Sequence, residues 1–295
     1  RVQPQVICDK QLCIWCDVDP LDHALACAYA WRTCPCGTNL AAGAEMLQLD
    51  KHYIDGQWIA PQTVGERPLI DPTTETAWAS VATGGSAADV DLAVMAARRA
   101  FAGFSRSSVA DRMALIDRII AAYQSREGEL SQLIDEQVAR WAAVDQDAAR
   151  DVIAAYAFER TLADTIVRRE AIGVCALISP WNWPIQTSVI KVIYGIAAGC
   201  TMVLKPSDAS PASGVALAQI MHAAGVPAGV FNLVIGRGSV VGEALSRHRH
   251  VDMVSFTGST TAGIKVGEAA AQTVKRVCLE LGGKSAMIVR ADADV

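Results

Sequence analysis

Residues 174–184, VCALISPWNWP, decide the fold, because a short apolar run ends there in a cluster of polar and turn-forming residues. A continuous apolar run of this length is typical of a strand buried on both faces of a parallel sheet. Four similar runs follow, at Thr201–Lys205, Val230–Val234, Met253–Phe256 and Arg276–Leu281. Helices are expected to begin between them, near Trp183, Pro211, Ser239 and Ser259. This alternation predicts an α/β fold, a Rossmann-like parallel sheet with helices on both faces.

The segment before this sheet is expected to contain helices and short strands. Ser86 opens a capping-box pattern ahead of apolar residues at helical spacing, and Ser108 opens a second helix. A third helical stretch is expected over about Glu129–Arg160, followed by a short strand, half of a hairpin, at Thr165–Glu170. Residues Leu47–Trp58 read as a strand with a turn at Asp-Gly.

Composition and charge argue against several classes of protein. The chain has 295 residues, of which 52% are hydrophobic and 19% charged, enough for a sizeable core. Its formal net charge of -5 argues against a nucleic-acid partner bound through its phosphates. No apolar run reaches the roughly 18 residues of a membrane span, and the start lacks a basic region followed by an apolar core. We therefore expect a cytoplasmic protein without a membrane partner.

Residues 1–45 differ in composition from the rest of the chain. They hold six of the nine cysteines and show no clear periodicity, and Met46 follows them. We expect the native protein to begin at or near Met46, with residues 1–45 as an unassigned extension outside the fold. A C-x-x-C pair at 13–16 and a C-x-C pair at 34–36 leave a zinc site as the alternative. The other cysteines, Cys175, Cys200 and Cys278, lie in apolar runs and are expected to be small core residues.

Polar residues follow the predicted strands at their carboxyl ends, where sheets of this kind bind ligands. Asn182 follows the first strand and is expected to be a buried amide, whose two N–H donors suit the stabilisation of an oxyanion; alternatively, it caps the next helix. Lys205 ends the second strand as a cation, and Asp208 follows within reach of a ribose diol. The alternative is that Ser207 or Asp208 caps the following helix.

Two glycine clusters and one acidic residue lie at the remaining strand ends. Residues 236–242 have the spacing G-x-G-x-x-x-G, one residue longer than the dinucleotide fingerprint. Residues 256–260, FTGST, place Ser259 and the first N–H groups of a helix where they form an anion site, although tight turns explain both clusters as well. In residues 279–286, LELGGKSA, Glu280 is expected to be half-buried between two leucines, as suits a general base. The alternative is an ordinary surface acid before a Gly-Gly turn.

Taken together, these strand ends resemble the aldehyde dehydrogenase superfamily. The segments that carry the resemblance are PWN (180–182), LKPS (204–207), GVPAGVFN (225–232), FTGST (256–260) and LELGGK (279–284), in family order. The resemblance covers about residues 46–295 and is most specific from Gly173 onward. It implies oxidation of an aldehyde to a carboxylic acid with NAD or NADP as acceptor, homo-oligomers among full-length members, and no metal.

The resemblance also implies roles for individual residues. A cysteine thiolate attacks the aldehyde, Asn182 and a backbone N–H hold the oxyanion, and Glu280 activates the water that hydrolyses the thioester. Lys205 and Asp208 bind the adenosine ribose, and the carboxylate favours NAD over NADP because it repels a 2′-phosphate. Ser259 binds the pyrophosphate. The implied cofactor residues are Ile178, Ser179, Pro180, Trp181, Lys205, Ser207, Asp208, Gly238, Gly242, Phe256, Thr257, Gly258, Ser259, Leu281 and Gly282.

The chain departs from the family pattern at its end, because the family's nucleophilic cysteine lies beyond Val295. We expect residues 46–279 to form the dinucleotide-binding domain, with part of an oligomerisation arm near 161–172. Residues 280–295 are expected to begin a catalytic domain that is truncated here. Two functions remain open. The first is an aldehyde dehydrogenase whose intact form is active although this chain alone is not. The second is a truncated nucleotide-binding remnant without catalytic activity.

Overall fold

The computed structural model describes residues 47–71, 75–128, 130, 150, 159–162, 165–284, 286 and 288–290. All of these residues belong to the unit Glu45–Val295. Within this described part, no helix combines the length and the apolar character that a membrane crossing would require.

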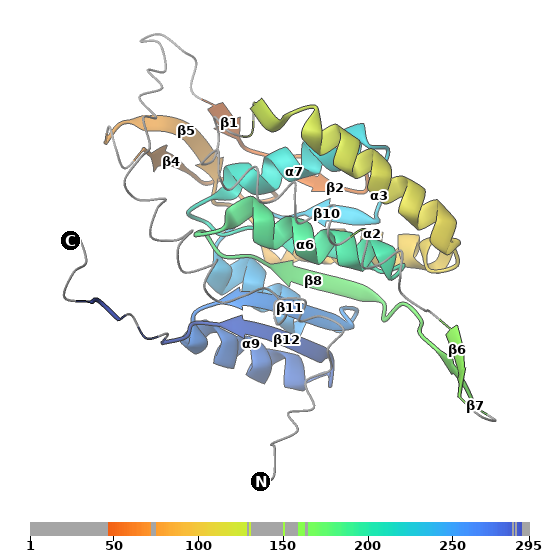
Figure 1. Ribbon diagram of the computed structural model, residues 1–295. Helices are drawn as coiled ribbons and strands as arrows, with labels where there is room; N and C mark the ends of the chain where they lie inside the picture. The colour runs from red at the N-terminus through yellow and green to blue at the C-terminus, as the bar shows by residue number, and fades with distance from the viewer. Residues whose placement is uncertain are drawn as a thin grey trace. The chain divides into compact units, whose positions relative to one another are not determined.

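A seven-stranded sheet is the centre of the fold (Figure 1). Its strands are β2 (His52–Ile54), β3 (Gln57–Ile59), β8 (Val174–Ile178), β9 (Thr201–Lys205), β10 (Phe231–Leu233), β11 (Met253–Gly258) and β12 (Arg276–Leu281). They lie in the order β12-β11-β8-β9-β10-β2-β3. The five strands from β12 to β10 run parallel, and the antiparallel hairpin β2–β3 is added beside β10. Every residue of β8 and β9 is buried, which explains why β8 is apolar throughout and β9 is apolar between Thr201 and Lys205.

Two smaller sheets accompany the main one. A three-stranded sheet has the order β1-β5-β4, in which β1 and β5 are parallel and β4 is antiparallel to β5. A separate antiparallel hairpin consists of β6 and β7. The bounds are β1 (Leu47–Leu49), β4 (Glu66–Ile70), β5 (Ala77–Ala82), β6 (Glu159–Leu162) and β7 (Thr165–Arg168).

The helices begin where the sequence provides a cap or a proline. The side chains of Ser86 and Ser108 each accept a hydrogen bond from an aspartate N–H three residues on, and that aspartate completes a capping box. Two other helices begin with proline, which lacks the N–H that a first turn leaves unpaired. The helices are α2 (Ala87–Phe104), α3 (Val109–Gln124), α6 (Pro184–Ala197), α7 (Pro211–Ala223), α8 (Glu243–Arg247) and α9 (Thr260–Ala271); a π-helical turn, η2 (Gly238–Gly242), precedes α8.

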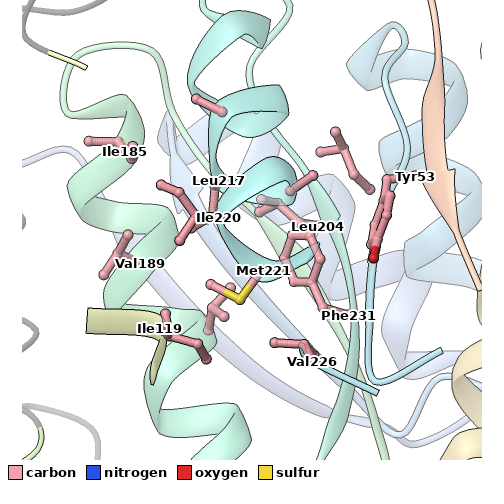
Figure 2. Close-up of a cluster of buried hydrophobic side chains, with 14 of the residues drawn as sticks. Tyr53, Ile119, Ile185, Val189, Leu204, Leu217, Ile220, Met221, Val226 and Phe231 are labelled. Carbon is pink, nitrogen blue, oxygen red and sulfur yellow. The ribbon is translucent and has the colours of Figure 1, made fainter. Parts of the chain in front are cut away.

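Helices cover both faces of the main sheet. On one face α6 and α7, backed by α3, bury a cluster in which Phe231 and Leu204 of the sheet meet Leu217 and Ile220 of α7 (Figure 2). On the other face α2, α8 and α9 bury a second cluster. The side chains of β8 alternate between the two, since Leu177 belongs to the first cluster and Ile178 to the second.

The predicted α/β fold is confirmed, and the five parallel strands and their helices lie close to the predicted positions. The helix expected over Glu129–Arg160 is wrong at its end, because Glu159 and Arg160 belong to β6 and pair with β7. Residues 131–149 and 151–158 lie outside the described residues. The strand expected over Leu47–Trp58 is three strands, since β1 joins a different sheet from β2 and β3.

The three cysteines expected in the core differ in burial. Cys175 and Cys200 are buried, as predicted, in and next to central strands. Cys278 is only half-buried, because β12 is the edge strand and has a neighbour on one side only. The six early cysteines, and with them the alternative of a zinc site, lie outside the described residues.

Candidate functional site

The register of the parallel strands gathers predicted site residues at one edge of the sheet. Ile178, at the end of β8, lies opposite both Lys205 of β9 and Phe256 of β11. One position further, Thr257 of β11 lies opposite Glu280 of β12. Because neighbouring strands are about 4.8 Å apart, these residues form a row across four strands. The carboxyl edge of the sheet therefore carries the candidate site.

A buried lysine and a half-buried aspartate form an ion pair at this edge. Lys205 is 3% exposed, and its Nζ donates to Asp208 Oδ1 at 2.5 Å and to the carbonyl oxygen of Pro206 at 2.8 Å. The backbone N–H of Gly238 donates to Asp208 Oδ2 at 3.3 Å. Burial lowers the pKa of Lys205, and the nearby Asp208 carboxylate opposes that decrease. The pair presents a cationic donor and a carboxylate acceptor together, a combination suited to vicinal hydroxyl groups.

Neither Ser207 nor Asp208 caps α7, so that alternative is wrong. The N-cap of α7 is Ser210, and no side-chain hydrogen bond closes this end. The Ser207 hydroxyl instead accepts a hydrogen bond from the N–H of Ala209 at 3.2 Å, which stabilises the turn between β9 and the helix. The Asp208 carboxylate has lone pairs that its bonds to Lys205 and Gly238 do not use, so it can accept further hydrogen bonds from a ligand.

A cavity of about 480 Å³ opens beside the ion pair. Of the predicted site residues, Asp208 and Gly238 line it. Another wall of the cavity is formed by β4, which contributes Arg67, and by the end of β5. The lining residues are Arg67, Val81, Ala82, Thr83, Asp208, Ile235, Gly236, Arg237, Gly238 and Ser239. Two guanidinium groups, one carboxylate and several backbone groups make the cavity suited to a polar ligand that carries hydroxyl and anionic groups.

Sequence reasoning missed the wall that β4 and β5 provide. Arg67 of β4 donates through Nη2 to the carbonyl oxygen of Asp208, across a sequence separation of 141 residues. No local pattern around Arg67 signals this contact, because a strand sequence does not encode which distant turn it will meet. Arg237, by contrast, lies inside the glycine cluster that the sequence singled out, and its position between two glycines was a usable signal.

The predicted oxyanion donor lies at the surface. Asn182 is exposed in the bend between β8 and α6, so the expectation of a buried amide is wrong, because this bend has no element packed over it among the described residues. It does not cap α6 either, since the N-cap is Trp183 without a side-chain hydrogen bond. Trp181, beside it, is 67% exposed. Ser179 is buried and accepts a hydrogen bond from Ser188 of α6 at 2.8 Å, which fixes the start of the bend.

The two glycine clusters open helical turns. Gly238 begins η2 at the cavity, and Gly242 ends it in a buried position. Ser259 is the N-cap of α9, where its hydroxyl accepts a hydrogen bond from the N–H of Ala262 at 3.3 Å. Its neighbours Thr257 and Gly258 are half-buried. The exposed first turn of α9 therefore has the unpaired N–H groups that an anion requires.

Glu280 is exposed, and the expectation of a half-buried carboxylate between two leucines is wrong in this structure. The reason is that β12 is an edge strand, so Leu279 and Leu281 are themselves 36% and 38% exposed. Gly282 continues from the strand as an exposed residue. The alternative of a surface acid describes the observed exposure of Glu280, whereas no turn is formed at Gly282 and Gly283.

A lysine that the sequence reasoning did not consider lies under this part of the sheet. Lys191 of α6 donates through Nζ to Ser255 Oγ of β11 at 2.6 Å. Burial lowers the pKa of Lys191 to about 8, and the nearby Cys278 and Glu280 oppose the decrease. Its position in the sequence, a single charge within the apolar run SVIKVIYG (188–195), was a signal that could have drawn attention to it.

Replacing Lys191 by methionine is expected to raise the free energy of unfolding at neutral pH by about 2 kcal/mol. Below a pH of about 8 the folded protein must hold an ammonium group that burial disfavours, at a cost only partly offset by the bond to Ser255. The unfolded chain binds this proton more tightly, so the stability of the wild type rises between about pH 8 and the ordinary lysine pKa, and the variant lacks that rise. Urea denaturation from neutral pH to the ordinary lysine pKa measures both the free energy of unfolding and its rise with pH.

Lys265→Met on α9 is the matched control, because Lys265 is exposed. It should change the free energy of unfolding by no more than about 0.5 kcal/mol. A Lys191→Met variant that is destabilised at neutral pH would show that the ammonium group contributes more through its contacts than its burial costs.

Comparison with known proteins places the chain among described relatives. The sequence profile of the aldehyde dehydrogenase family matches residues 58–295. A 3-succinoylsemialdehyde-pyridine dehydrogenase from a Pseudomonas species is 48% identical over 255 residues, which cover 82% of this chain and 53% of the relative. The chain thus spans about half the length of the curated relatives it matches.

Solved structures agree with the sequence comparison. Aldehyde dehydrogenase C of Pseudomonas syringae, a mutant crystallised with NAD+ and octanal, is 49% identical with a TM-score of 0.78 over 83% of this chain and 53% of that one. Betaine aldehyde dehydrogenase of Staphylococcus aureus, crystallised with NAD+, is 28% identical with a TM-score of 0.76 over 80% of this chain and 50% of that one.

Proposed function

This chain belongs to the aldehyde dehydrogenase family, and we propose that it forms the NAD-binding part of an enzyme that oxidises an aldehyde to a carboxylic acid. The observation that carries the proposal is the ion pair of Lys205 and Asp208 beside a cavity at the carboxyl edge of a parallel sheet. Sheets of this kind bind nucleotides at that edge. The similar Pseudomonas syringae enzyme was crystallised with NAD+ and octanal, which supports both the cofactor and the substrate class.

The residues at the edge fit a dinucleotide. NAD supplies a hydride acceptor, and the chain's contribution is to hold it. Asp208 would accept hydrogen bonds from the adenosine ribose hydroxyls while Lys205 donates to them, and Ser259 with the first turn of α9 would hold the pyrophosphate. The backbone of residues 178–181 would line the cleft. Because a carboxylate repels a 2′-phosphate, we propose a preference for NAD over NADP.

Two residues are proposed to act on the substrate. The Asn182 amide would donate to the oxygen of the aldehyde as it gains negative charge, and its exposed position leaves the N–H groups accessible. Glu280 would take a proton from the water that hydrolyses the thioester of the reaction. The half-buried Lys191 lies close enough to Glu280 to interact with its charge, so the carboxylate has a cation beneath it.

The domain assignment is proposed on the same resemblance. Residues 46–279 would be the dinucleotide-binding domain and 280–295 the start of the catalytic domain. The hairpin of β6 and β7 would belong to an arm near 161–172 that joins subunits of a homo-oligomer. Because the chain spans about half the length of its relatives, nucleotide binding without catalysis is the second candidate function.

Titration of the 295-residue chain with NAD, followed by tryptophan fluorescence, tests nucleotide binding. Trp181 is 67% exposed beside the site, so its emission should respond. We expect saturable binding of NAD and about tenfold weaker binding of NADP, because the 2′-phosphate meets the Asp208 carboxylate. In the matched variant Asp208→Asn, the difference between the two nucleotides should shrink. Wild-type protein that binds neither nucleotide would contradict the proposed function.

The same preparation tests whether this chain catalyses the oxidation by itself. With NAD and acetaldehyde or octanal, we expect this chain alone to form no NADH, and Glu280→Gln should leave NAD affinity unchanged because Glu280 lies outside the cavity. NADH formation that Glu280→Gln abolishes would instead show that these residues suffice for catalysis.

A further inference from the structure

A histidine and an aspartate are fully buried behind the cavity and have no role in the proposed chemistry. His52 of β2 and Asp89 of α2 are both 0% exposed. The His52 Nε2 atom lies 3.7 Å from Asp89 Oδ2 and has no hydrogen-bond partner in the part of the chain that the structure describes. A buried polar pair of this kind is costly unless its remaining atoms are bonded, so the contacts of those atoms indicate what the pair does.

The other ring nitrogen of His52 holds the cavity wall. The backbone N–H of Ile235 donates to His52 Nδ1 at 3.2 Å, across a separation of 183 residues. Because Nδ1 accepts this bond, the proton of the neutral ring is assigned to Nε2, which faces Asp89. Ile235 and Gly236 both line the cavity. His52 therefore fixes the segment after β10 that forms one side of the proposed nucleotide site.

Asp89 holds the opposite side. Its Oδ2 accepts from the N–H of Ser86 at 2.9 Å and from the Ser86 hydroxyl at 2.7 Å, and its Oδ1 accepts from the N–H of Gln62 at 3.1 Å. These bonds anchor the connection from β5 to α2. Thr83, the first residue of that connection, lines the cavity. The Asp89 carboxylate thus contacts three segments of the chain, at Ser86, at Gln62 and at His52.

The backbone at Gly85 and the backbone at Ile235 lie so close together that neither can move toward the other. A Cβ added at Gly85 would lie 2.0 Å from the carbonyl oxygen of Ile235. Gly236 has a φ of +154° and would bring a Cβ within 2.6 Å of Val241. Since backbone meets backbone here, any movement of Ile235 is transmitted to the wall of the cavity.

We propose that His52 and Asp89 are positioning residues for the nucleotide cavity, which together lock the Ile235–Gly236 backbone against the turn that leads into α2. The proposal rests on the proposed function, because it assumes that the cavity receives the adenosine part of NAD. It requires the neutral form of His52, since a protonated Nδ1 cannot accept the N–H of Ile235.

The state of His52 makes nucleotide binding depend on pH. Burial lowers the pKa of His52, and Asp89, which among the described residues is the charged group acting on it, opposes the decrease through its negative charge. The folded protein therefore keeps the ring neutral below the ordinary histidine value of 6.5. As pH falls through the lowered pKa, the ring gains a proton, the Ile235 bond is lost and the wall relaxes.

The pH profile of NAD affinity tests the proposal in the 295-residue chain. As the pH falls from about 7.5 to below the lowered pKa of His52, the wild-type dissociation constant for NAD should rise about fivefold, the effect of one hydrogen bond. His52→Asn should bind NAD like the wild type at the upper pH and show no such rise, because Oδ1 of asparagine can accept the Ile235 bond and does not titrate. His52→Leu should bind about fivefold more weakly throughout.

His222→Asn is the matched control, because His222 is an exposed histidine that contacts Tyr53 and does not line the cavity. It should retain the wild-type profile. A His52→Asn profile that parallels the wild type would overturn the proposal, and so would wild-type affinity in a folded His52→Leu variant. Either result leaves the proposed function intact, whereas a wild type that binds no NAD at any pH overturns both.

Discussion

Replacing Phe231 by alanine is expected to lower the free energy of unfolding by about 4 kcal/mol. Phe231 is 1% exposed in β10, between the strand that ends in Lys205 and the hairpin β2–β3. Figure 2 shows its ring beside Leu204 and Val226, with Tyr53 close by. The neighbours belong to regular strands and a helix that cannot collapse into the vacated space, so most of the cavity would remain.

Urea denaturation followed by far-UV circular dichroism measures this loss. Ile264→Ala on α9 is the control, since Ile264 is 56% exposed and its truncation should change the free energy by no more than about 0.5 kcal/mol. A Phe231→Ala variant that loses less than about 2 kcal/mol would show that this cluster is packed more loosely than its burial implies. Because Ile235, two residues after the end of β10, lines the cavity, the variant should also bind NAD more weakly.

Replacing Lys205 by methionine is expected to weaken NAD binding by a factor between about 10 and 100. Methionine keeps the buried aliphatic stem, so the strand should fold, but the cationic donor disappears. Asp208 then keeps the N–H of Gly238 and loses its 2.5 Å partner. Its charge is left uncompensated beside an anionic ligand, which adds repulsion to the lost hydrogen bond.

Calorimetric titration with NAD measures the change, with Lys51→Met as the control because Lys51 is an exposed lysine outside the cavity. The control should bind NAD as the wild type does. The folded state of Lys205→Met is checked by its denaturation midpoint, because the lost contacts to Pro206 and Asp208 oppose the gain from removing a charge that burial disfavours. Unchanged NAD affinity in a folded Lys205→Met variant would show that the ion pair does not take part in NAD binding.

The order of strands and helices could be predicted because each element depends on its own residues. The apolar run that ends at Ile178 is buried at every position of β8, and Ser86 and Ser108 cap their helices as the sequence indicates. The carboxyl-end position of Lys205 and Glu280 follows from where their strands stop. These predictions needed only local patterns of polarity, capping and turn formation.

The environment of those residues could not be predicted, because it depends on which segments meet. Glu280 was expected between buried leucines and is exposed, since its strand is the last in the sheet. Asn182 was expected to be buried and lies in a surface bend. Lys191 reaches Ser255 from a helix on another part of the chain. In each case burial depends on contacts between residues far apart in sequence.

By itself, then, the sequence determined the parallel sheet, its covering helices and the polar residues at the strand ends, because spacing and polarity act between neighbours in the chain. Only the tertiary structure decided that Arg67 and Asp208 share a cavity and that His52 and Asp89 brace its wall. Arg67 and its partner Asp208, and His52 and its partner Ile235, are each more than a hundred positions apart in the sequence. The His52 contact forms because the main sheet places β2 beside β10, and the Arg67 contact forms because β4, in a separate sheet, meets the connection after β9. No local pattern specifies such contacts.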